Sequence, residues 1–181
     1  MQTQQRIPAI DPAQAQGQAK QLLDAVKAKF GKAPNMMRTM AVSPALLDGY
    51  LSFNNALSTG VLDPKFREQL ALAVSQANGC SYCLSAHSTI GKMVGLNPDE
   101  IADSRQARSP QDPKIDAGLR FAQALVVMRG KISDEAFAEV KAAGWDDAAI
   151  AEIIAHVALN VLTNYFNEAV KTVVDFPKVE A

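Results

Sequence analysis

The sequence predicts an all-α protein, a compact domain of about eight or nine helices. Helix-start signals recur along the chain, glycines stand where helices should end, and alternating strand patterns are nearly absent. Five pairs place a capping side chain before proline at the first helical position: Asp11-Pro12, Ser43-Pro44, Asp63-Pro64, Asn97-Pro98 and Asp112-Pro113. The predicted ends, where left-handed backbone favours glycine, are near Gly31, Gly60, Gly95, Gly130 and Gly144.

Taken in order, these signals predict helices at residues 12–30, 35–41, 44–59, 64–78, 80–94, 98–104, 113–129, 134–143 and 147–172. Short connections between them favour antiparallel packing of neighbours. We expect one domain over residues 1–181, with an N-terminal arm at about 1–40, a core bearing both cysteines at about 44–104, and a C-terminal helical half at about 113–175. The polar connector 104–113 is the best candidate for a hinge between the halves.

The composition excludes several classes of protein. Apolar residues make up 48% of the chain, the net charge is −1, and aromatic residues are only 6%, so neither nucleic acid nor an anionic membrane is an expected partner. The most apolar stretch, residues 150–162, is interrupted by Glu152, His156 and Asn160, and the N-terminal sequence lacks the apolar core of a signal peptide. We therefore expect a soluble cytoplasmic protein.

The two cysteines, Cys80 and Cys83, form one C-x-x-C motif. In a reducing compartment such a pair is more often catalytic or metal-binding than structural. Asn78-Gly79 should end one helix and begin the next, which places both thiols in a first turn where the helix dipole favours a thiolate. Two sulfurs at this spacing can also close a small disulfide.

His87 follows Cys83 by four residues and shares its helical face, so its imidazole can accept the thiol proton or stabilise the thiolate. Glu68 lies twelve residues before Cys80, and a turn at Gly79 must fold its helix back to bring the carboxylate near His87. The dipole alone favours ionisation of Cys80, whereas the spacing of His87 favours Cys83. We favour Cys83 because a positioned base supplies both ionisation and a proton for a leaving alkoxide.

The pattern of Glu68, Cys80, Cys83 and His87 resembles the AhpD-like branch of the carboxymuconolactone decarboxylase superfamily. The motif covers about twenty residues, and the helical pattern extends the similarity to most of the chain. The resemblance implies an AhpD-like helical fold that assembles into homotrimers or homohexamers. It also implies alkylhydroperoxide reductase activity on organic hydroperoxides, with no bound cofactor or metal and with a dihydrolipoyl-type dithiol reductant on a partner protein.

Carried over residue by residue, the resemblance implies that Cys83 attacks the peroxide and becomes a sulfenic acid, which Cys80 then converts into a disulfide. Glu68 and His87 would form the proton relay. The chain departs from the family pattern at Tyr82, where a second histidine can occur, so the details of the relay stay open.

Other functions stay open at this point. The pair could serve a redox-sensing or thiol–disulfide exchange module without physiological peroxidase activity, or the helical scaffold could belong to a non-redox binding protein. A carboxymuconolactone-decarboxylase-like enzyme is a further alternative, although that branch typically lacks the cysteine pair. The thiols could also be small core residues, or bind zinc with His87 and Glu68, but a closed zinc site usually needs two separated pairs.

Four further residues are candidates for lining a pocket: Tyr82, His156, Asn160 and Asn164. The last three recur every fourth residue on an apolar helix, so they form either a polar stripe in the pocket or a buried hydrogen-bonded seam. We favour the seam.

Three methionines and one tryptophan carry weaker expectations. Met36, Met37 and Met40 either line a peroxide entrance or, as we favour, fill the core. Trp145 is expected to plug a surface groove.

The sequence also contains one weak internal repeat. Glu152 precedes Asn164-Tyr-Phe-Asn167 by the same interval that separates Glu68 from the C-x-x-C motif. A decayed duplication and chance both account for it.

Overall fold

The computed structural model describes residues 4–181, and in that range it contains nine helices and no strand. The helices are α1 (Gly17–Phe30), α2 (Asn35–Met40), α3 (Pro44–Ser58), α4 (Pro64–Ala77), α5 (Ser81–Met93), α6 (Pro98–Arg105), α7 (Pro113–Val127), α8 (Asp134–Ala142) and α9 (Asp147–Val170). The predicted all-α fold is confirmed, and the predicted helices correspond one to one with these nine, with the largest difference at the start of α1.

Four of the five predicted caps form as expected. The side chains of Ser43, Asp63, Asn97 and Asp112 each accept a backbone N–H from the first turn of α3, α4, α6 and α7. Proline at the next position costs no hydrogen bond, because that N–H would lack a helical partner.

The fifth cap, at Asp11-Pro12, is wrong. The Asp11 carboxylate accepts the N–H of Ala13 at 3.0 Å, and the Asp11 carbonyl accepts the N–H of Gln14 at 2.9 Å, so this segment is a turn. Gly17 then adopts a left-handed φ of 56°. Helix α1 therefore begins at Gly17 rather than near residue 12. The prediction was wrong because an Asp side chain accepts the same kind of backbone N–H in a turn as it does at the start of a helix.

Glycines with left-handed backbone follow the helices at Gly31, Gly95, Gly130 and Gly144, as expected. Gly60 differs, because its φ is not left-handed. A glycine is needed there because a larger side chain would have no room. The carboxylate of Glu152 on α9 lies against Gly60, where a Cβ would collide with it, and accepts the N–H groups of Val61 and Leu62.

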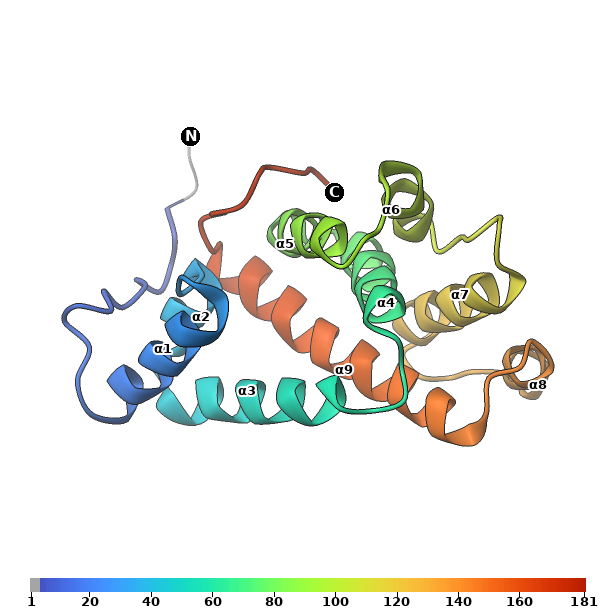
Figure 1. Ribbon diagram of the computed structural model, residues 1–181, viewed down its shortest axis with the longest axis horizontal. Coiled ribbons are helices and arrows are strands. Elements are labelled where there is room, and N and C mark those ends of the chain that lie inside the picture. Colours follow the sequence, from blue (N-terminus) through green and yellow to red (C-terminus); the bar gives the residue numbers. More distant parts are fainter. Residues whose placement is uncertain (1–3) are drawn as a thin grey trace.

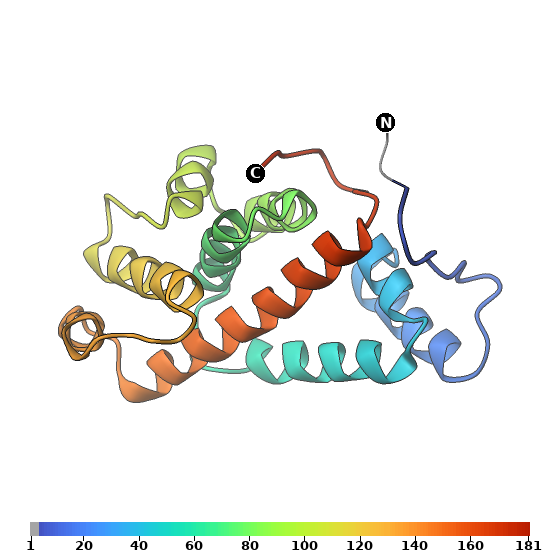
Figure 2. The same ribbon diagram turned by 180° about the vertical axis from the view of Figure 1, so that it is seen from behind.

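Helix α4 is the centre of the fold and packs against α5, α6, α7 and α9. Figure 1 shows α9 running diagonally across the molecule, with α1 and α2 beyond one of its ends and α8 beside the other. The view from behind in Figure 2 shows the same long helix in front, with α3 alongside part of it. The chain after α9, residues 171–181, runs back over α5 without forming a helix; we call it the C-terminal segment.

One apolar cluster joins α4, α7 and α9. Phe66, Leu119 and Ile153 are almost fully buried in it. The ring of Trp145 stacks on Phe66 at 4.5 Å between centroids, and its indole N–H donates to the Lys114 carbonyl at 2.8 Å. Trp145 is thus part of this core, not the plug of a surface groove. The expectation failed because the sequence did not show that the indole N–H has a buried backbone partner.

A second cluster joins α1, α2 and α3 to the start of α5. It contains Leu23, Val26, Met40 and Leu47 together with both cysteines. The thiols therefore lie where the N-terminal helices meet the central ones.

Helix α9 is the one helix in residues 4–181 that is long and apolar enough to cross a membrane by length and composition alone. Half of its apolar window is buried inside the protein. Core helices of soluble proteins pass the same test, so this observation is weak support for a membrane span.

Candidate active site

The C-x-x-C motif occupies the first turn of α5. Gly79 takes a left-handed φ of 66° and ends the turn after α4, and Cys80 is the N-cap of α5. The Cys80 sulfur accepts the backbone N–H of Cys83 at 3.4 Å. Both thiols are free and almost fully buried, at 0% and 2% exposure.

His87 and Glu68 meet across the α4–α5 interface. His87 Nδ1 lies 2.7 Å from Glu68 Oε2, and the two side chains are 22% and 17% exposed. The turn at Gly79 returns α5 along α4, so a carboxylate twelve residues before Cys80 reaches an imidazole one turn after Cys83. The structure therefore brings together the two residues of the predicted relay, Glu68 and His87, beside the two cysteines.

Two asparagines on α9 close the other side of the motif. Asn167 Nδ2 lies 3.3 Å from Cys83 Sγ and 3.2 Å from Met36 Sδ. Asn164 is fully buried behind the turn, where its amide donates to Ser75 and accepts from Asn78. Asn164 thus belongs to a buried seam and not to a pocket lining.

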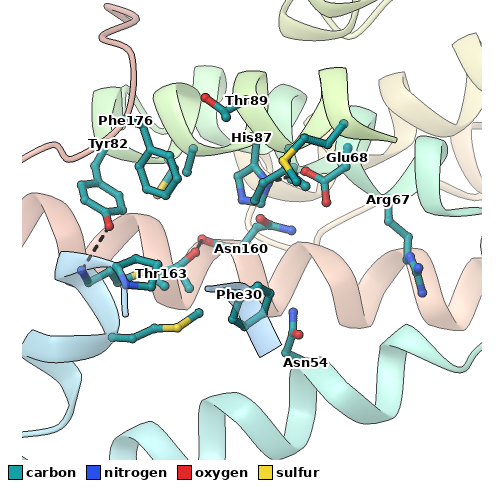
Figure 3. Close-up of a pocket in the computed structure, with 18 of the residues that line it drawn as sticks. Phe30, Asn54, Arg67, Glu68, Tyr82, His87, Thr89, Asn160, Thr163 and Phe176 are labelled. Carbon is teal, nitrogen blue, oxygen red and sulfur yellow. Dashed lines mark hydrogen bonds and ion pairs between the residues drawn. The ribbon is translucent and has the colours of Figure 1, made fainter. Parts of the chain in front are cut away.

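A cavity of about 700 Å³ opens beside Cys83. Glu68 and His87 line it, as do three of the four residues predicted to line a pocket, Tyr82, His156 and Asn160. Figure 3 shows His87 and Glu68 above Asn160, with Arg67 at the right and Asn54 below, beside Phe30. The rest of the lining is mainly apolar and includes Phe30, Met36, Met37, Leu159 and Phe176.

The cavity separates residues that we expected to share one environment. His156 and Asn160 face the cavity as a polar stripe, whereas we had favoured a seam for all three residues of the repeat. Met36, Met37 and Met40 are all buried in the second apolar cluster, as we favoured, and Met36 and Met37 also line the cavity. The helical period could not show which part of α9 faces open space.

The thiols have opposite electrostatic environments. A hydrogen bond from Cys80 is the largest effect on Cys83, and with the positive charge of His87 and the amides of Asn167 and Asn164 it outweighs burial and lowers the pKa of Cys83 to about 7. The same hydrogen bond, together with burial, raises the pKa of Cys80 well above its usual range. Cys83 is therefore the thiol that ionises more readily, in line with the spacing of His87 and against the dipole argument for Cys80.

The surroundings of His87 favour the charged form of its imidazole. Burial alone lowers its pKa, but the negative charge of Glu68, the hydrogen bond to it and the nearby Cys83 together raise the pKa of His87. An imidazolium beside a thiolate forms an ion pair that can also deliver a proton.

Several residues at the cavity escaped the sequence analysis. Tyr50, Asn54 and Arg67 reach it from α3 and α4, and Asp175 and Phe176 from the C-terminal segment. No local pattern marks them, because only the tertiary fold brings these segments to the site. Asn167 is an exception, because the weak internal repeat in the sequence ends at this residue: Glu152 precedes the Asn164–Asn167 pair by the interval that separates Glu68 from the C-x-x-C motif.

Tyr82 links the motif to the C-terminal segment. Its hydroxyl accepts the N–H of Met36 at 3.1 Å and donates to Asp175 Oδ1 at 2.9 Å. The ring also meets the edge of Phe176. Within residues 4–181, no three His, Cys, Asp or Glu side chains converge as a metal ion would require.

Comparison with known proteins agrees with the motif and the fold. Residues 44–124 match the Carboxymuconolactone decarboxylase family. A comparison with curated proteins finds no significant match. The 15 similar solved structures include several that cover nearly the whole chain.

A peroxidase-related protein from Ralstonia eutropha, described as an alkylhydroperoxidase AhpD core, is 24% identical with a TM-score of 0.84 over 94% of this chain and 92% of that one. A peroxidase-related protein from Silicibacter sp. is 22% identical with a TM-score of 0.80, covering 96% and 94%. A cysteine-to-alanine variant of the debrominase Bmp8, bound to 2,3,4-tribromopyrrole, is 20% identical with a TM-score of 0.82, covering 97% and 94%.

At these identities the structural likeness establishes a common fold, and the debrominase shows that this fold serves more than one activity. The family match covers the segment that carries Glu68, the C-x-x-C motif and His87. Together they support the resemblance drawn from the motif: residues 44–124 match the carboxymuconolactone decarboxylase family, and the chain as a whole has an AhpD-like fold.

Proposed function

We propose that this protein is a thiol-dependent peroxidase that reduces organic hydroperoxides through Cys83 and Cys80. The observation that carries the proposal is the Cys83 thiol, whose pKa is lowered to about 7, at the wall of a mainly apolar cavity and beside the His87–Glu68 pair. A thiolate is the nucleophilic form of cysteine, so Cys83 is substantially reactive at neutral pH.

In the first step the Cys83 thiolate attacks one peroxide oxygen and the O–O bond breaks. The sulfur is oxidised to a sulfenic acid, and the departing alkoxide takes a proton from the His87 imidazolium to give an alcohol. Glu68 raises the pKa of His87 and so favours the charged form that this step needs.

In the second step the Cys80 thiol attacks the Cys83 sulfur, the S–O bond breaks, and water leaves as the disulfide forms. Cys80 keeps its proton until then, because its pKa is raised. An external dithiol returns both cysteines to thiols and is itself oxidised to a disulfide. A slender dithiol arm of the dihydrolipoyl type, presented by a partner protein, suits thiols that only the cavity makes accessible.

The size and polarity of the cavity support bulky apolar hydroperoxides as substrates. About 700 Å³ falls in the range of sites that enclose drug-sized ligands. The paired thiols are too buried for a folded protein surface to reach, which argues against exchange with protein disulfides as the main activity.

We also propose a cytoplasmic homotrimer or homohexamer. Exposed apolar side chains on α9, among them Ile154, Leu162 and Tyr165, support self-association, because large apolar residues on one helix face are typical of interfaces.

The decisive experiment follows the two thiols during reaction with cumene hydroperoxide. One equivalent should remove both free thiols, and a dithiol reductant should restore turnover. Cys83→Ser should abolish peroxide consumption, whereas Cys80→Ser should leave a sulfenic acid on Cys83 that dimedone labels. Labelling of Cys80 in the Cys83→Ser variant would reverse the assignment, and unreactive thiols at pH 8 would exclude the reaction altogether.

Reductive debromination is the second candidate, because a similar structure binds 2,3,4-tribromopyrrole. In that reaction the two thiols supply two electrons, C–Br is replaced by C–H, bromide leaves, and the same disulfide forms. Bromide release from tribromopyrrole without consumption of hydroperoxide would favour this activity over the peroxidase.

A further inference from the structure

The carboxamide of Asn167 contacts two sulfur atoms at the base of the cavity. Its nitrogen lies 3.3 Å from Cys83 Sγ and 3.2 Å from Met36 Sδ, so each of its two N–H bonds has a sulfur acceptor. The side chain is 2% exposed. Among residues 4–181 its buried carbonyl oxygen has no hydrogen-bond partner.

This orientation is most favourable when one sulfur carries charge. A buried carbonyl without a partner costs free energy, and native proteins contain few of them. A thioether and a neutral thiol are weak acceptors, so they offset little of that cost. A thiolate is a strong acceptor, because hydrogen bonds to ionised groups are roughly twice as strong as neutral ones.

We infer that Asn167 is the hydrogen-bond donor that stabilises the Cys83 thiolate, and that Met36 orients its amide by accepting the second N–H. The consequence for peroxide turnover rests on the proposed function. The ionisation of Cys83 does not, because it is measured without substrate.

Other groups around Cys83 must be separated from this effect. The titratable ones nearest to Cys83 are Tyr50 on α3, Glu68 on α4, Cys80 at the N-cap of α5, and Tyr82 and His87 on α5. Glu168 on α9 acts on Cys80, and Asp175 in the C-terminal segment accepts a hydrogen bond from Tyr82. Burial raises the pKa of both tyrosines, so they stay neutral between pH 6 and 9, and Cys80 keeps its proton there. His87 is the neighbour whose titration needs an independent control, which Cys83→Ser supplies.

The first test leaves Asn167 intact. In the reduced full chain labelled with ¹⁵N, the side-chain amide signals of Asn167 should move with pH, with a midpoint near that of Cys83. The same signals should lose this titration in Cys83→Ser, where no thiolate forms. Amide signals that are unaffected by pH in the unsubstituted protein, or that titrate equally in Cys83→Ser, would overturn the inference.

The second test measures iodoacetamide alkylation of Cys83 against pH, with tandem mass spectrometry to separate it from Cys80. Asn167→Leu should raise the apparent pKa of Cys83 by about one unit, the scale of one charge-assisted hydrogen bond. Ser104→Ala is the control, because Ser104 is a fully buried polar residue on α6 that lies outside the cavity lining and whose hydroxyl donates to the Glu100 carbonyl. It should leave the pKa of Cys83 unchanged, and equal shifts in both variants would contradict a direct hydrogen bond.

Reaction with cumene hydroperoxide gives a readout that a purely structural role would not produce. A one-unit rise lowers the thiolate fraction at pH 7 from about half to about a tenth, but the more basic thiolate is about two- to threefold more nucleophilic. Asn167→Leu should therefore react about twofold slower at pH 7 and about twofold faster at pH 9. Slower reaction at both values would refute the role. A titrating amide in a protein that consumes no peroxide would refute the proposed function and leave the thiolate donor in place.

Discussion

Replacing Glu68 by glutamine tests whether its charge sets the state of the site. The substitution keeps the shape of the side chain but removes the negative charge 2.7 Å from His87 Nδ1. Both side chains are mostly buried, so a charge-assisted hydrogen bond of about 1.5–3 kcal/mol is lost with little screening by water. Burial then dominates at His87, and the pKa of His87 should fall instead of being raised.

The loss extends to the thiol. A neutral imidazole no longer stabilises the Cys83 thiolate, so the pKa of Cys83 should rise from about 7 by about one unit. The thiolate fraction at pH 7 then falls from about half to about a tenth, and the more basic thiolate is about two- to threefold more nucleophilic, so alkylation by iodoacetamide should be about twofold slower at that pH.

Two measurements follow the effect. The chain has two histidines, so proton NMR titration resolves His87 once His156→Gln has identified the other signal. Stopped alkylation assays against pH give the Cys83 value. Glu139→Gln, at an exposed carboxylate on α8, is the control and should change neither. An unchanged His87 midpoint in Glu68→Gln, or unchanged thiol reactivity at pH 7, would refute the electrostatic account.

Three further predictions concern stability and packing. Gly118→Ala should lower the free energy of unfolding by about 1–3 kcal/mol, because the added Cβ would lie 2.7 Å from the buried ring of Phe66. Gly49→Ala is the control and should be neutral or slightly stabilising, because the space around Gly49 is open. Denaturant titration of both variants measures the difference. Tyr82→Phe should leave the buried N–H of Met36 without a partner and release Asp175, which lowers the free energy of unfolding by about 1–3 kcal/mol. Hydrogen exchange in residues 173–179 should become faster, and equal exchange in both proteins would contradict the anchoring role of Tyr82. Because folding raises the pKa of His87, protonated His87 stabilises the folded protein fully below about pH 6.5, and this contribution is lost as pH rises through the higher pKa of the folded state. The melting temperatures of Glu68→Gln and of the unsubstituted protein should therefore differ at pH 6 and converge toward pH 9.

Local signals were sufficient for most of the fold. The caps at Ser43, Asp63, Asn97 and Asp112 were predictable because each depends on a side chain and the backbone within three residues of it. Asp11 shows the limit of such signals, since turns and helix starts use the same hydrogen bond. The burial of Trp145 against Phe66 depends on contacts between distant segments, which no local pattern encodes.

The candidate site divides in the same way. Cys80, Cys83 and His87 lie on one helix, so their proximity follows from its period, and a single turn at Gly79 is enough to add Glu68. Asn167, Arg67 and the C-terminal segment approach from other elements. Their placement depends on how α9 and α3 cross the central helices, and the sequence pattern carries no measure of those angles.

The length of α9 has a consequence for how the protein loses its structure. Its 24 residues extend about 36 Å and contribute Ile150 and Ile153 to the cluster around α4 and Phe166 to the cluster around the thiols. Neither cluster can come apart without exposing part of a helix that the other needs. We therefore expect melting to be cooperative across both, with one calorimetric transition, so that damage far from the thiols shortens the lifetime of the thiol environment as well.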